Sequence, residues 1–385
     1  MSKISFIDLK TQQARVSARI GEHFGAVLEK CDFIGGAFVA DLEARLADRA
    51  GAACVTCASG TDALVLALMA LDLQPGDHVV CPSYTFAATA EAVALLGAIP
   101  VFVDVDAVTL NIDVAATAQA IAAHEGHVKG VIAVDIFGQP ADYAALGDLT
   151  ARHGLWLIAD AAQSFGARTA AGPVGSLAAI TTTSFYPAKP LGCYGDGGAL
   201  FTADAALAQR LRSLRNHGQA QQRYLYDAVG LCSRLDTLQA GVLLAKLDIF
   251  DDELAARQRV ADHYATQLGD LLAVPRLAPG NRSTWAQYTV ALPAGAGETL
   301  AELAQRRDRT VARLAARGVP AQVYYAPAMH RQPPYRDFPH GAMDVTERLS
   351  ASTFSLPMHA YLDGEALGTI VHFVREACDD SAPAV

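Results

Sequence analysis

The chain has 385 residues, of which 52% are hydrophobic and 18% charged, a balance typical of folded globular proteins and not of disordered ones. The 40 acidic and 30 basic residues give a formal net charge of −10, which argues against nucleic acid or an anionic membrane surface as the main partner. A small anionic ligand is compatible with this charge, because one arginine-lined pocket is enough to bind it.

The sequence carries no sign of export or of a membrane anchor. Its first ten residues lack the apolar core and small-residue cleavage site of a secretion signal. No apolar run reaches the roughly 18 residues that a membrane span requires. The seven cysteines are an odd number in a long chain, which is typical of a reduced compartment. We therefore expect a soluble cytoplasmic enzyme.

Between about residues 51 and 201, short apolar runs alternate with helical stretches rich in Ala and Leu. This alternation predicts an α/β fold with a mostly parallel sheet that helices cover on both faces. Ligands of such sheets lie beyond the carboxyl ends of the strands. The expected strands are 54–58, 78–82, 99–104, 128–135, 155–160, 180–185 and a returning strand 198–201, and the expected helices include 61–71, 85–96 and 143–153.

The pattern changes after about residue 240. We expect a long helix from Asp236 through Tyr264, and then the three further elements of a smaller α+β domain: a strand near 284–292, a helix near 308–317 and a final helix around 363–377. The sequence thus predicts a large domain of residues 1–245 and a small C-terminal domain of residues 246–385.

One lysine stands out because of the segment that presents it. Residues 182–198 (TTSFYPAKPLGCYGDGG) run from a predicted strand through a proline-bounded turn to Lys189 and then into a glycine-rich stretch. A lysine that is partly desolvated and deprotonated is a nucleophile suited to forming a Schiff base. Taken alone, Lys189 would be read as a solvated loop residue.

A second segment, 155–166 (LWLIADAAQSFG), ends an apolar strand with Asp160 at the carboxyl edge of the sheet. Pyridoxal 5′-phosphate (PLP) needs a carboxylate there, because pairing with the ring nitrogen keeps the pyridinium protonated. Gln163 follows in the same turn and is placed to hydrogen-bond the phenolic oxygen of such a cofactor. The alternative is that Asp160 only caps a following helix.

A third segment, 58–64 (ASGTDAL), lies between a predicted strand and a predicted helix. Free N–H groups at a helix start bind phosphate, and here Gly60 permits close approach while Thr61 supplies a hydroxyl. Ser184, at the end of a later strand, is a further candidate phosphate ligand, and Phe86 is a candidate for stacking on a pyridine ring. Each of these residues alone also fits helix capping or core packing.

The order of these parts is more specific than any one of them. A phosphate cup, an aspartate at a strand end and a lysine in a strand turn follow one another, each after a strand of a parallel sheet. This is the layout of PLP enzymes of the aspartate aminotransferase type, so we expect that fold for the large domain. The pair Cys54 and Cys57 lies on a predicted strand, where buried structural cysteines are expected, and no metal site is predicted.

With these motifs in hand, the chain resembles the nucleotide-sugar aminotransferases of the DegT/DnrJ/StrS family over nearly its full length. The matching segments are FIDLK (6–10), SGTDAL (59–64), EAVALLGA (91–98), DAAQSFG (160–166), SRLDTLQA (233–240) and LPMHAYL (356–362). The run KPLGCYGDGG (189–198) is most similar to the branch that acts at C3 of UDP-2-acetamido-2-deoxy-3-keto-glucuronic acid.

The resemblance implies PLP as the cofactor and L-glutamate as the amino donor. It implies that Lys189 forms the Schiff base and shuttles the proton, that Asp160 pairs with the pyridine nitrogen, and that Gln163 contacts the phenolic oxygen. It also implies a homodimer with shared active sites, in which the segment before Leu235 reaches into the neighbouring subunit. The remaining cofactor contacts that it implies are Gly60, Thr61 and Ser184 at the phosphate and Phe86 on the ring.

The sequence departs from the family pattern at two places. Cys232 stands where the family usually has Asn, so a phosphate contact across the subunits would move to Ser233 or to a water, while Arg234 is retained and suits an anionic substrate group.

In the C-terminal part, Tyr324 replaces the first histidine of the family's His-Tyr-Pro…His run. Tyr325 and His330 are therefore the expected substrate contacts in this segment.

The expected reaction is transfer of an amino group from L-glutamate to C3 of a UDP-linked 3-keto-2-acetamido-uronic acid for lipopolysaccharide O-antigen synthesis. Alternatives are a dTDP-linked 3-keto- or 4-keto-deoxyhexose as acceptor, or a PLP-dependent sugar dehydratase, in which histidine replaces the lysine. A sensory protein that keeps the fold without turnover is a third class, which the intact set of Lys189, Asp160 and Gln163 disfavours.

Overall fold

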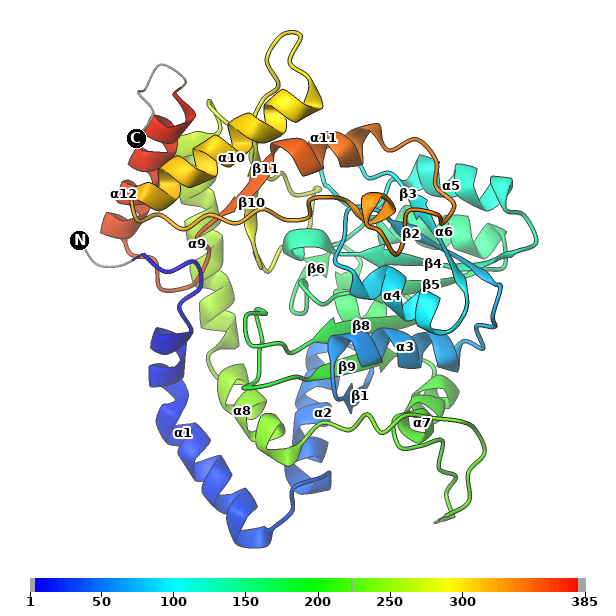
Figure 1. Cartoon of the computed structure of the whole chain (residues 1–385). Helices are drawn as coiled ribbons and strands as arrows, with labels where there is room; N and C mark the ends of the chain where they lie inside the picture. The colour runs from blue at the N-terminus through cyan, green and yellow to red at the C-terminus, as the bar shows by residue number, and fades with distance from the viewer. Residues whose placement is uncertain (1–3, 223, 380–385) are drawn as a thin grey trace.

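The computed structural model describes residues 4–222 and 224–379 (Figure 1). The α-helices are α1 (Leu9–Lys30), α2 (Gly36–Ala50), α3 (Gly60–Ala70), α4 (Ala88–Leu95), α5 (Val114–Ala123), α6 (Tyr143–Arg152), α7 (Ala205–Leu214), α8 (Thr237–Leu247), α9 (Phe250–Leu268), α10 (Leu300–Ala316), α11 (Asp344–Ser352) and α12 (Gly364–Cys378). The strands are β1 (Ala53–Cys57), β2 (His78–Pro82), β3 (Ile99–Val103), β4 (Val128–Val134), β5 (Trp156–Asp160), β6 (Arg168–Thr169), β7 (Gly172–Pro173), β8 (Ile180–Ser184), β9 (Gly198–Thr202), β10 (Tyr288–Ala291) and β11 (Thr353–Leu356).

The main sheet of the described chain has seven strands in the order β1-β9-β8-β5-β4-β2-β3. Strands β8, β5, β4, β2 and β3 run parallel to their neighbours, and β9 is antiparallel to both β8 and β1. The sequence-based prediction of a mostly parallel sheet with a returning strand is confirmed. All seven predicted strands are present, with ends within about one residue of the prediction.

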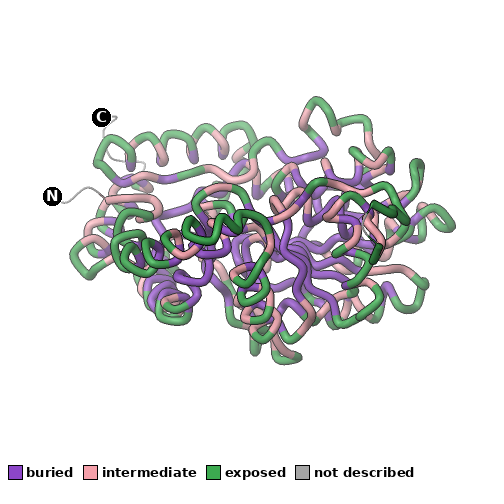
Figure 2. The backbone as a smooth tube through the Cα atoms, turned by 90° about the horizontal axis from the view of Figure 1, so that it is seen from below, coloured by how far each residue is buried: buried purple, intermediate pink, exposed green. Residues whose placement is uncertain are grey.

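Helices cover the sheet on both faces because its strands are apolar on both sides. Alternate residues of a strand point to opposite faces, so Val79 packs with α3 and α4 while Val80 packs with α5 and α6. A further cluster joins α2 and α8 to β1 and β9. Figure 2 shows the strands as the buried interior, with most exposed residues on the outer helices and loops.

The C-terminal part has a hydrophobic cluster of its own, built from α9, α10, α12, β10 and β11. Its antiparallel pair, β10 with β11, is separate from the main sheet. This arrangement agrees with an α+β unit after the large sheet, while the boundary at residues 245 and 246 stays a prediction.

Some expected elements differ from the structure. The helix expected from Asp236 through Tyr264 is two helices, because Asp248 and Ile249 form a turn between α8 and α9. The helix expected at 308–317 starts earlier, at Leu300, because Thr299 and Glu302 form a capping box there. The strand expected at 284–292 is shorter and begins at Tyr288.

Candidate active site

The register of the main sheet brings separate segments together at its carboxyl edge. Ser184, at the end of β8, pairs with Gly198 of β9, and Gly198 pairs in turn with Cys57, at the end of β1. The loop after Cys57 leads directly into α3 through Ser59. The start of α3 therefore lies beside Ser184, as the prediction of a shared phosphate cup requires.

Glycine is needed where these segments touch. A Cβ atom on Gly60 would stand 2.6 Å from the Cβ of Ser184, and one on Gly198 would run into the carbonyl oxygen of Ser59. The Ser59 hydroxyl caps α3 by accepting a hydrogen bond of 3.0 Å from the N–H of Asp62. The N–H groups of Gly60 and Thr61, in the first turn of α3, have no carbonyl partner within the helix. Because Gly60 lies against Ser184, these N–H groups are close to the Ser184 hydroxyl and can bind a phosphate group.

A buried serine from a distant segment fixes this loop. The Ser233 hydroxyl accepts a hydrogen bond of 3.2 Å from the N–H of Ala58 and donates one of 2.6 Å to the Asp62 carboxylate. The Ser233 side chain is completely buried. The expectation that Ser233 takes over a phosphate contact across the subunits is therefore corrected: its hydroxyl is already bonded within its own chain, where it supports the cup from behind.

Asp160 ends β5 and is buried at the same edge of the sheet. Its carboxylate accepts hydrogen bonds of 3.1 Å from the N–H of Ala162 and 3.3 Å from the hydroxyl of Thr89. Burial raises the pKa of Asp160, and the Ala162 N–H, the charge of Lys189 and the Thr89 hydroxyl oppose this rise. A carboxylate held in this way gains stability from a cation placed against it.

Lys189 lies in a tight turn after β8, where its N–H donates to the carbonyl of Tyr186 at 2.9 Å. Burial lowers the pKa of its ammonium group, and the nearby Asp160 carboxylate opposes the shift. The turn is braced from α8 by Lys246, whose ammonium donates a hydrogen bond of 2.6 Å to the Gly192 carbonyl. Lys189 thus combines a fixed backbone with an amine that loses its proton more readily than an exposed lysine does.

Gln163 is buried beside these groups and is held at both ends of its amide. Its Oε1 accepts a hydrogen bond of 2.7 Å from the N–H of Phe137, and its Nε2 donates one of 2.8 Å to the Tyr325 hydroxyl. The Phe137 and Tyr325 rings are stacked, with centroids 6.1 Å apart. One N–H of the Gln163 amide is left for a ligand. The Phe86 ring, 58% exposed, lies 6.5 Å from that of Tyr325.

A second buried carboxylate lies directly after the neighbouring strand β4, and the sequence motifs did not predict it. Asp135 follows β4, and its N–H donates to the carbonyl of Asp160. Its own carboxylate accepts hydrogen bonds from Ser164 (2.5 Å), Tyr143 (2.6 Å) and the N–H of Ala141 (2.7 Å). Burial raises the pKa of Asp135 to about 7 despite these three donors. Asp135 therefore anchors the turn that carries Gln163.

Comparison with known proteins identifies the family. The family model for DegT/DnrJ/EryC1/StrS aminotransferases matches residues 15–375. The chain belongs to this family. It is 43% identical to the UDP-2-acetamido-2-deoxy-3-oxo-D-glucuronate aminotransferase of Pseudomonas aeruginosa over 95% of this chain and 98% of that one. It is 38% identical to a UDP-N-acetyl-3-dehydro-alpha-D-glucosamine 3-aminotransferase of Acidithiobacillus ferrooxidans, over 97% of both chains. The crystal structure of S. venezuelae DesV in complex with a ketimine intermediate superposes with a TM-score of 0.92 at 33% identity, covering 99% of this chain and 100% of that chain.

The protein is accordingly an aminotransferase, and aminotransferases of this family use PLP. The residues present fit this cofactor. The close contact of Gly60 with Ser184, which a Cβ would disrupt, brings the first N–H groups of α3 beside the Ser184 hydroxyl, and together these donors suit a phosphate group. The buried Asp160 carboxylate suits a protonated pyridine nitrogen, and Lys189 comes from the adjacent strand turn. The fold of aspartate aminotransferase type expected from the sequence is confirmed.

His330, predicted to contact substrate, is buried in a different role. Its Nδ1 lies 2.7 Å from the Ser83 hydroxyl and its Nε2 lies 3.2 Å from the Glu347 carboxylate. Both ring nitrogens are therefore engaged between the loop after β2 and α11. In this arrangement, a direct contact of His330 with substrate would require one of these bonds to break.

Arg234 lies next to the cup on the half-exposed segment that precedes α8. Its guanidinium donates hydrogen bonds of 3.0 Å to Asn216 and 3.1 Å to the Cys232 sulfur. The exposed Cys232 thus orients Arg234. The guanidinium has donors left for an anionic group, because these two bonds use only two of its five N–H groups.

Two further expectations concern cysteines and metals. Cys54 and Cys57 are buried on β1 as expected, and burial raises the pKa of both thiols. Within residues 4–222 and 224–379, no group of His, Cys, Asp or Glu side chains has an arrangement that could hold a metal ion. Over the same ranges, no helix has the length and apolar character needed to cross a membrane.

Proposed function

We propose that this aminotransferase moves the amino group of L-glutamate to C3 of a UDP-linked 3-keto-2-acetamido-uronic acid. The product would be UDP-2-acetamido-3-amino-2,3-dideoxy-glucuronate, an intermediate for lipopolysaccharide O-antigen. The observation that carries this proposal is the 43% identity, over 95% of the chain, to the P. aeruginosa enzyme named for that 3-oxo-uronate substrate. The second relative is also named for C3 of a UDP-linked 2-acetamido sugar, which supports the position and the nucleotide.

Transfer of an amino group requires a protein base that takes a proton from the substrate carbon and later returns it. We assign the role of this base to the Nζ atom of Lys189. Burial lowers the pKa of its ammonium group, so more of the amine is unprotonated near neutral pH. When bound, PLP supplies an electron sink for the charge left on the substrate carbon. Asp160 holds a negative charge against the pyridine nitrogen and so maintains that capacity.

We assign the remaining cofactor contacts to the groups around the cup. The N–H groups of Gly60 and Thr61 and the hydroxyl of Ser184 would hold the phosphate, and the free amide N–H of Gln163 would reach the phenolic oxygen. The Phe86 ring would lie on the pyridine face, because it is exposed and next to Tyr325. These assignments use groups that have hydrogen-bonding capacity or surface to spare.

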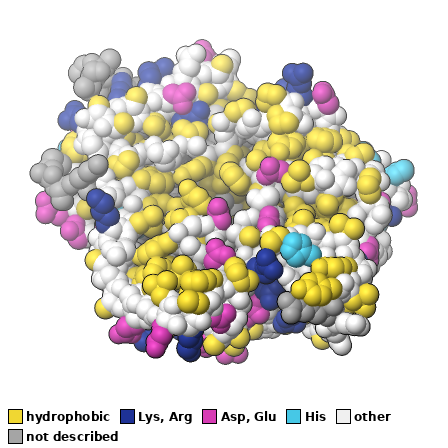
Figure 3. All heavy atoms as spheres, turned by 60° about the horizontal axis from the view of Figure 1, so that its bottom comes forward, with side chains coloured by type: hydrophobic (Ala, Val, Ile, Leu, Met, Phe, Trp, Pro, Cys, Tyr) yellow, Lys and Arg dark blue, Asp and Glu magenta, His cyan; other side chains and the backbone are white. Residues whose placement is uncertain are grey.

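For the sugar nucleotide we assign Arg234 to an anionic group, the uronate or the diphosphate. The Tyr325 hydroxyl, which accepts from Gln163, can donate its own proton to substrate, and His330 would act next to it if its link with Ser83 or Glu347 opened. We propose a cytoplasmic homodimer with shared active sites, as the family resemblance implies. Hydrophobic side chains are numerous on the face turned forward in Figure 3, as a subunit interface requires.

The test is a panel of donors and acceptors with the PLP-loaded protein, read by product mass. We expect L-glutamate and the UDP-3-keto-uronate to give the fastest turnover. The matched acceptor is UDP-N-acetyl-3-dehydro-glucosamine, which has a hydroxymethyl group in place of the carboxylate. Lys189→Ala should abolish turnover with every pair. Faster reaction of a dTDP-linked 3-keto- or 4-keto-deoxyhexose would overturn the assignment of substrate.

A further inference from the structure

Two arginines lie opposite each other on a short ladder beside the site. Arg168 of β6 and Arg282 form an antiparallel bridge in which each N–H donates to the other's carbonyl, at 3.1 and 2.8 Å. Residues paired in this way project their side chains from the same face of the ladder. Two guanidinium groups are thus held on one side of a rigid backbone link.

Neither arginine of this pair forms an ion pair with a carboxylate among the described residues. No carboxylate lies within 4.0 Å of either guanidinium among residues 4–222 and 224–379, and both side chains are exposed to solvent. Like charges placed directly across a ladder repel each other. The neighbouring arginines differ, because Arg49 is bonded to both carboxylate oxygens of Asp251 at 2.8 Å and Arg45 is bonded to Asp248. Of these four arginines, Arg168 and Arg282 are the two that form no ion pair with the described residues.

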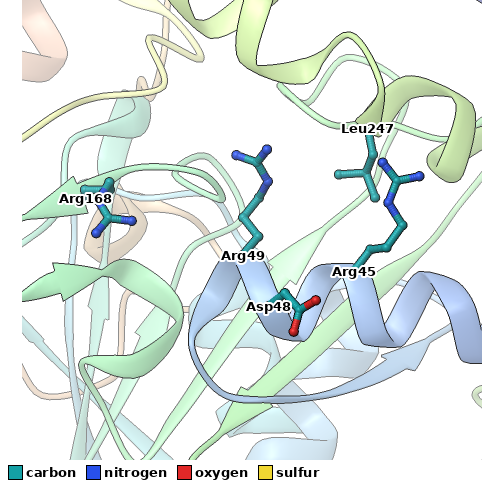
Figure 4. A pocket seen from close by; sticks show the side chains of 5 residues that line it. All are labelled: Arg45, Asp48, Arg49, Arg168 and Leu247. Carbon is teal, nitrogen blue, oxygen red and sulfur yellow. The ribbon is translucent and has the colours of Figure 1, made fainter.

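The paired arginines line a cavity of about 830 Å³ where residues 165–175 of the large sheet region meet α9 and residues 277–283. Arg49 forms another part of its wall, and Leu254 and Leu277 give it apolar surface. An adjoining hollow of about 450 Å³ is lined by Arg45, Asp48, Arg49, Arg168 and Leu247. Figure 4 shows Arg45 and Arg49 rising from α2, with Arg168 on β6 at another side of the hollow.

We propose that this cavity is a binding site for a phosphorylated ligand with at least two negative charges. Guanidinium groups bind phosphate through paired N–H donors, and a dianion would neutralise Arg168 and Arg282 together. The volume lies in the range of small-molecule sites, and the leucine surface suits a base or another flat apolar group. A nucleoside diphosphate therefore fits this site better than inorganic pyrophosphate, which would use only the charges.

The site joins two parts of the chain that also meet beside Gln163. Arg168 follows the turn of Gln163 by five residues, while Arg282 precedes Thr284, whose hydroxyl donates to the Gln163 carbonyl at 2.5 Å. A ligand that bridges Arg168 and Arg282 would therefore hold the Gln163 turn and the C-terminal part together.

The test uses the PLP-loaded protein, so that the phosphate cup is filled, and titrates pyrophosphate and UDP separately by calorimetry at low salt. We expect wild-type protein and the control Arg152→Gln, an exposed arginine on α6, to bind UDP with equal affinity. Arg168→Gln and Arg282→Gln should each weaken binding at least tenfold, with pyrophosphate binding more weakly than UDP. Because UDP also resembles part of the proposed substrate, UDP can bind at the catalytic site as well, and Arg234→Gln is included to separate the two sites. It should weaken only the binding event at the catalytic site and leave the event that depends on Arg168 and Arg282 unchanged.

A second measurement does not depend on ligand affinity. Without added anion, Arg168→Gln should unfold at a temperature no lower than wild type, because the substitution removes the repulsion. With saturating UDP the order should reverse, since only wild type gains from binding at the cavity of Arg168 and Arg282. Equal UDP binding by wild type, Arg168→Gln and Arg282→Gln would overturn the proposal, and so would a loss of binding only in Arg234→Gln.

Discussion

The amide nitrogen of Gln163 donates a hydrogen bond of 2.8 Å to the hydroxyl of Tyr325, a residue 162 positions later in the chain. The backbone carbonyl of the same glutamine accepts a hydrogen bond of 2.5 Å from the Thr284 hydroxyl. The C-terminal part therefore holds the turn after β5 at two points. Any shift of that part relative to the sheet moves the residue assigned to the phenolic oxygen of PLP.

The first prediction concerns this link. Tyr325→Phe leaves the buried Gln163 amide without one acceptor, and an unsatisfied buried donor costs about 1–3 kcal/mol. We expect the free energy of unfolding of the cofactor-free protein to fall by about that amount in urea titrations. Tyr226→Phe, which removes the hydroxyl of an exposed tyrosine, is the control and should change it little.

The second prediction concerns the cup. Gly60→Ala places a methyl group 2.6 Å from the Cβ of Ser184, so α3 and β8 must separate. We expect PLP to bind at least about tenfold more weakly, which corresponds to ~1.4 kcal/mol, in spectroscopic titrations of the cofactor-free protein. The matched control is Gly21→Ala in α1, where an added Cβ meets nothing within 4 Å. This substitution should raise the free energy of unfolding by up to about 1 kcal/mol. Equal PLP affinity in the Gly60 variant and wild type would contradict the assigned phosphate site.

The strands and the order of the three site motifs were predictable, because they depend on local patterns. Each apolar run is bounded by turn residues, and a residue at the end of a parallel strand must lie at the carboxyl edge of the sheet. Asp160 and Ser184 could therefore be placed at the same edge from the sequence alone. The break between α8 and α9 was missed, since no Pro or Gly marks it: Asp248 and Ile249 form a turn in a sequence with continuous helical pattern.

The supporting contacts were not predictable, because they join residues distant in sequence. Ser233 reaches Ala58 across 175 positions, and Thr284 reaches Gln163 across 121. A single serine or threonine in a loop gives no local sign of its partner. His330 illustrates the opposite case. Its place in the family's His-Tyr-Pro…His run suggested substrate contact, while the packing of α11 against the loop after β2 engages both of its nitrogens.

The third prediction tests the support from Ser233. Ser233→Ala removes the acceptor of the Ala58 N–H and a donor to Asp62, so the loop that precedes α3 loses its inner anchor. We expect weaker PLP binding together with a loss of about 1–3 kcal/mol in unfolding free energy. Amide hydrogen exchange of the peptide around residues 57–62 should speed up in the cofactor-free variant. Unchanged exchange there would show that Ser233 does not hold the loop.

The last prediction is a pH dependence that originates at Asp135. Its pKa is about 7 in the folded chain because burial disfavours the charged carboxylate, whereas the ordinary value is 3.8. Between about pH 4 and pH 7 the unfolded chain has lost this proton and the folded chain keeps it, so the folded state binds more protons. Stability contributed by this group is therefore largest below pH 4 and falls as the pH rises to 7, by on the order of 4 kcal/mol.

In Asp135→Asn the amide can keep the bonds to Ala141 and Ser164 without titrating, so unfolding free energies of the cofactor-free variant should decline less over this range. Asp148→Asn, an exposed carboxyl group on α6, should follow the wild-type profile. Parallel profiles for wild type and Asp135→Asn would mean that Asp135 is already ionised in the folded protein and that its three donors outweigh its burial.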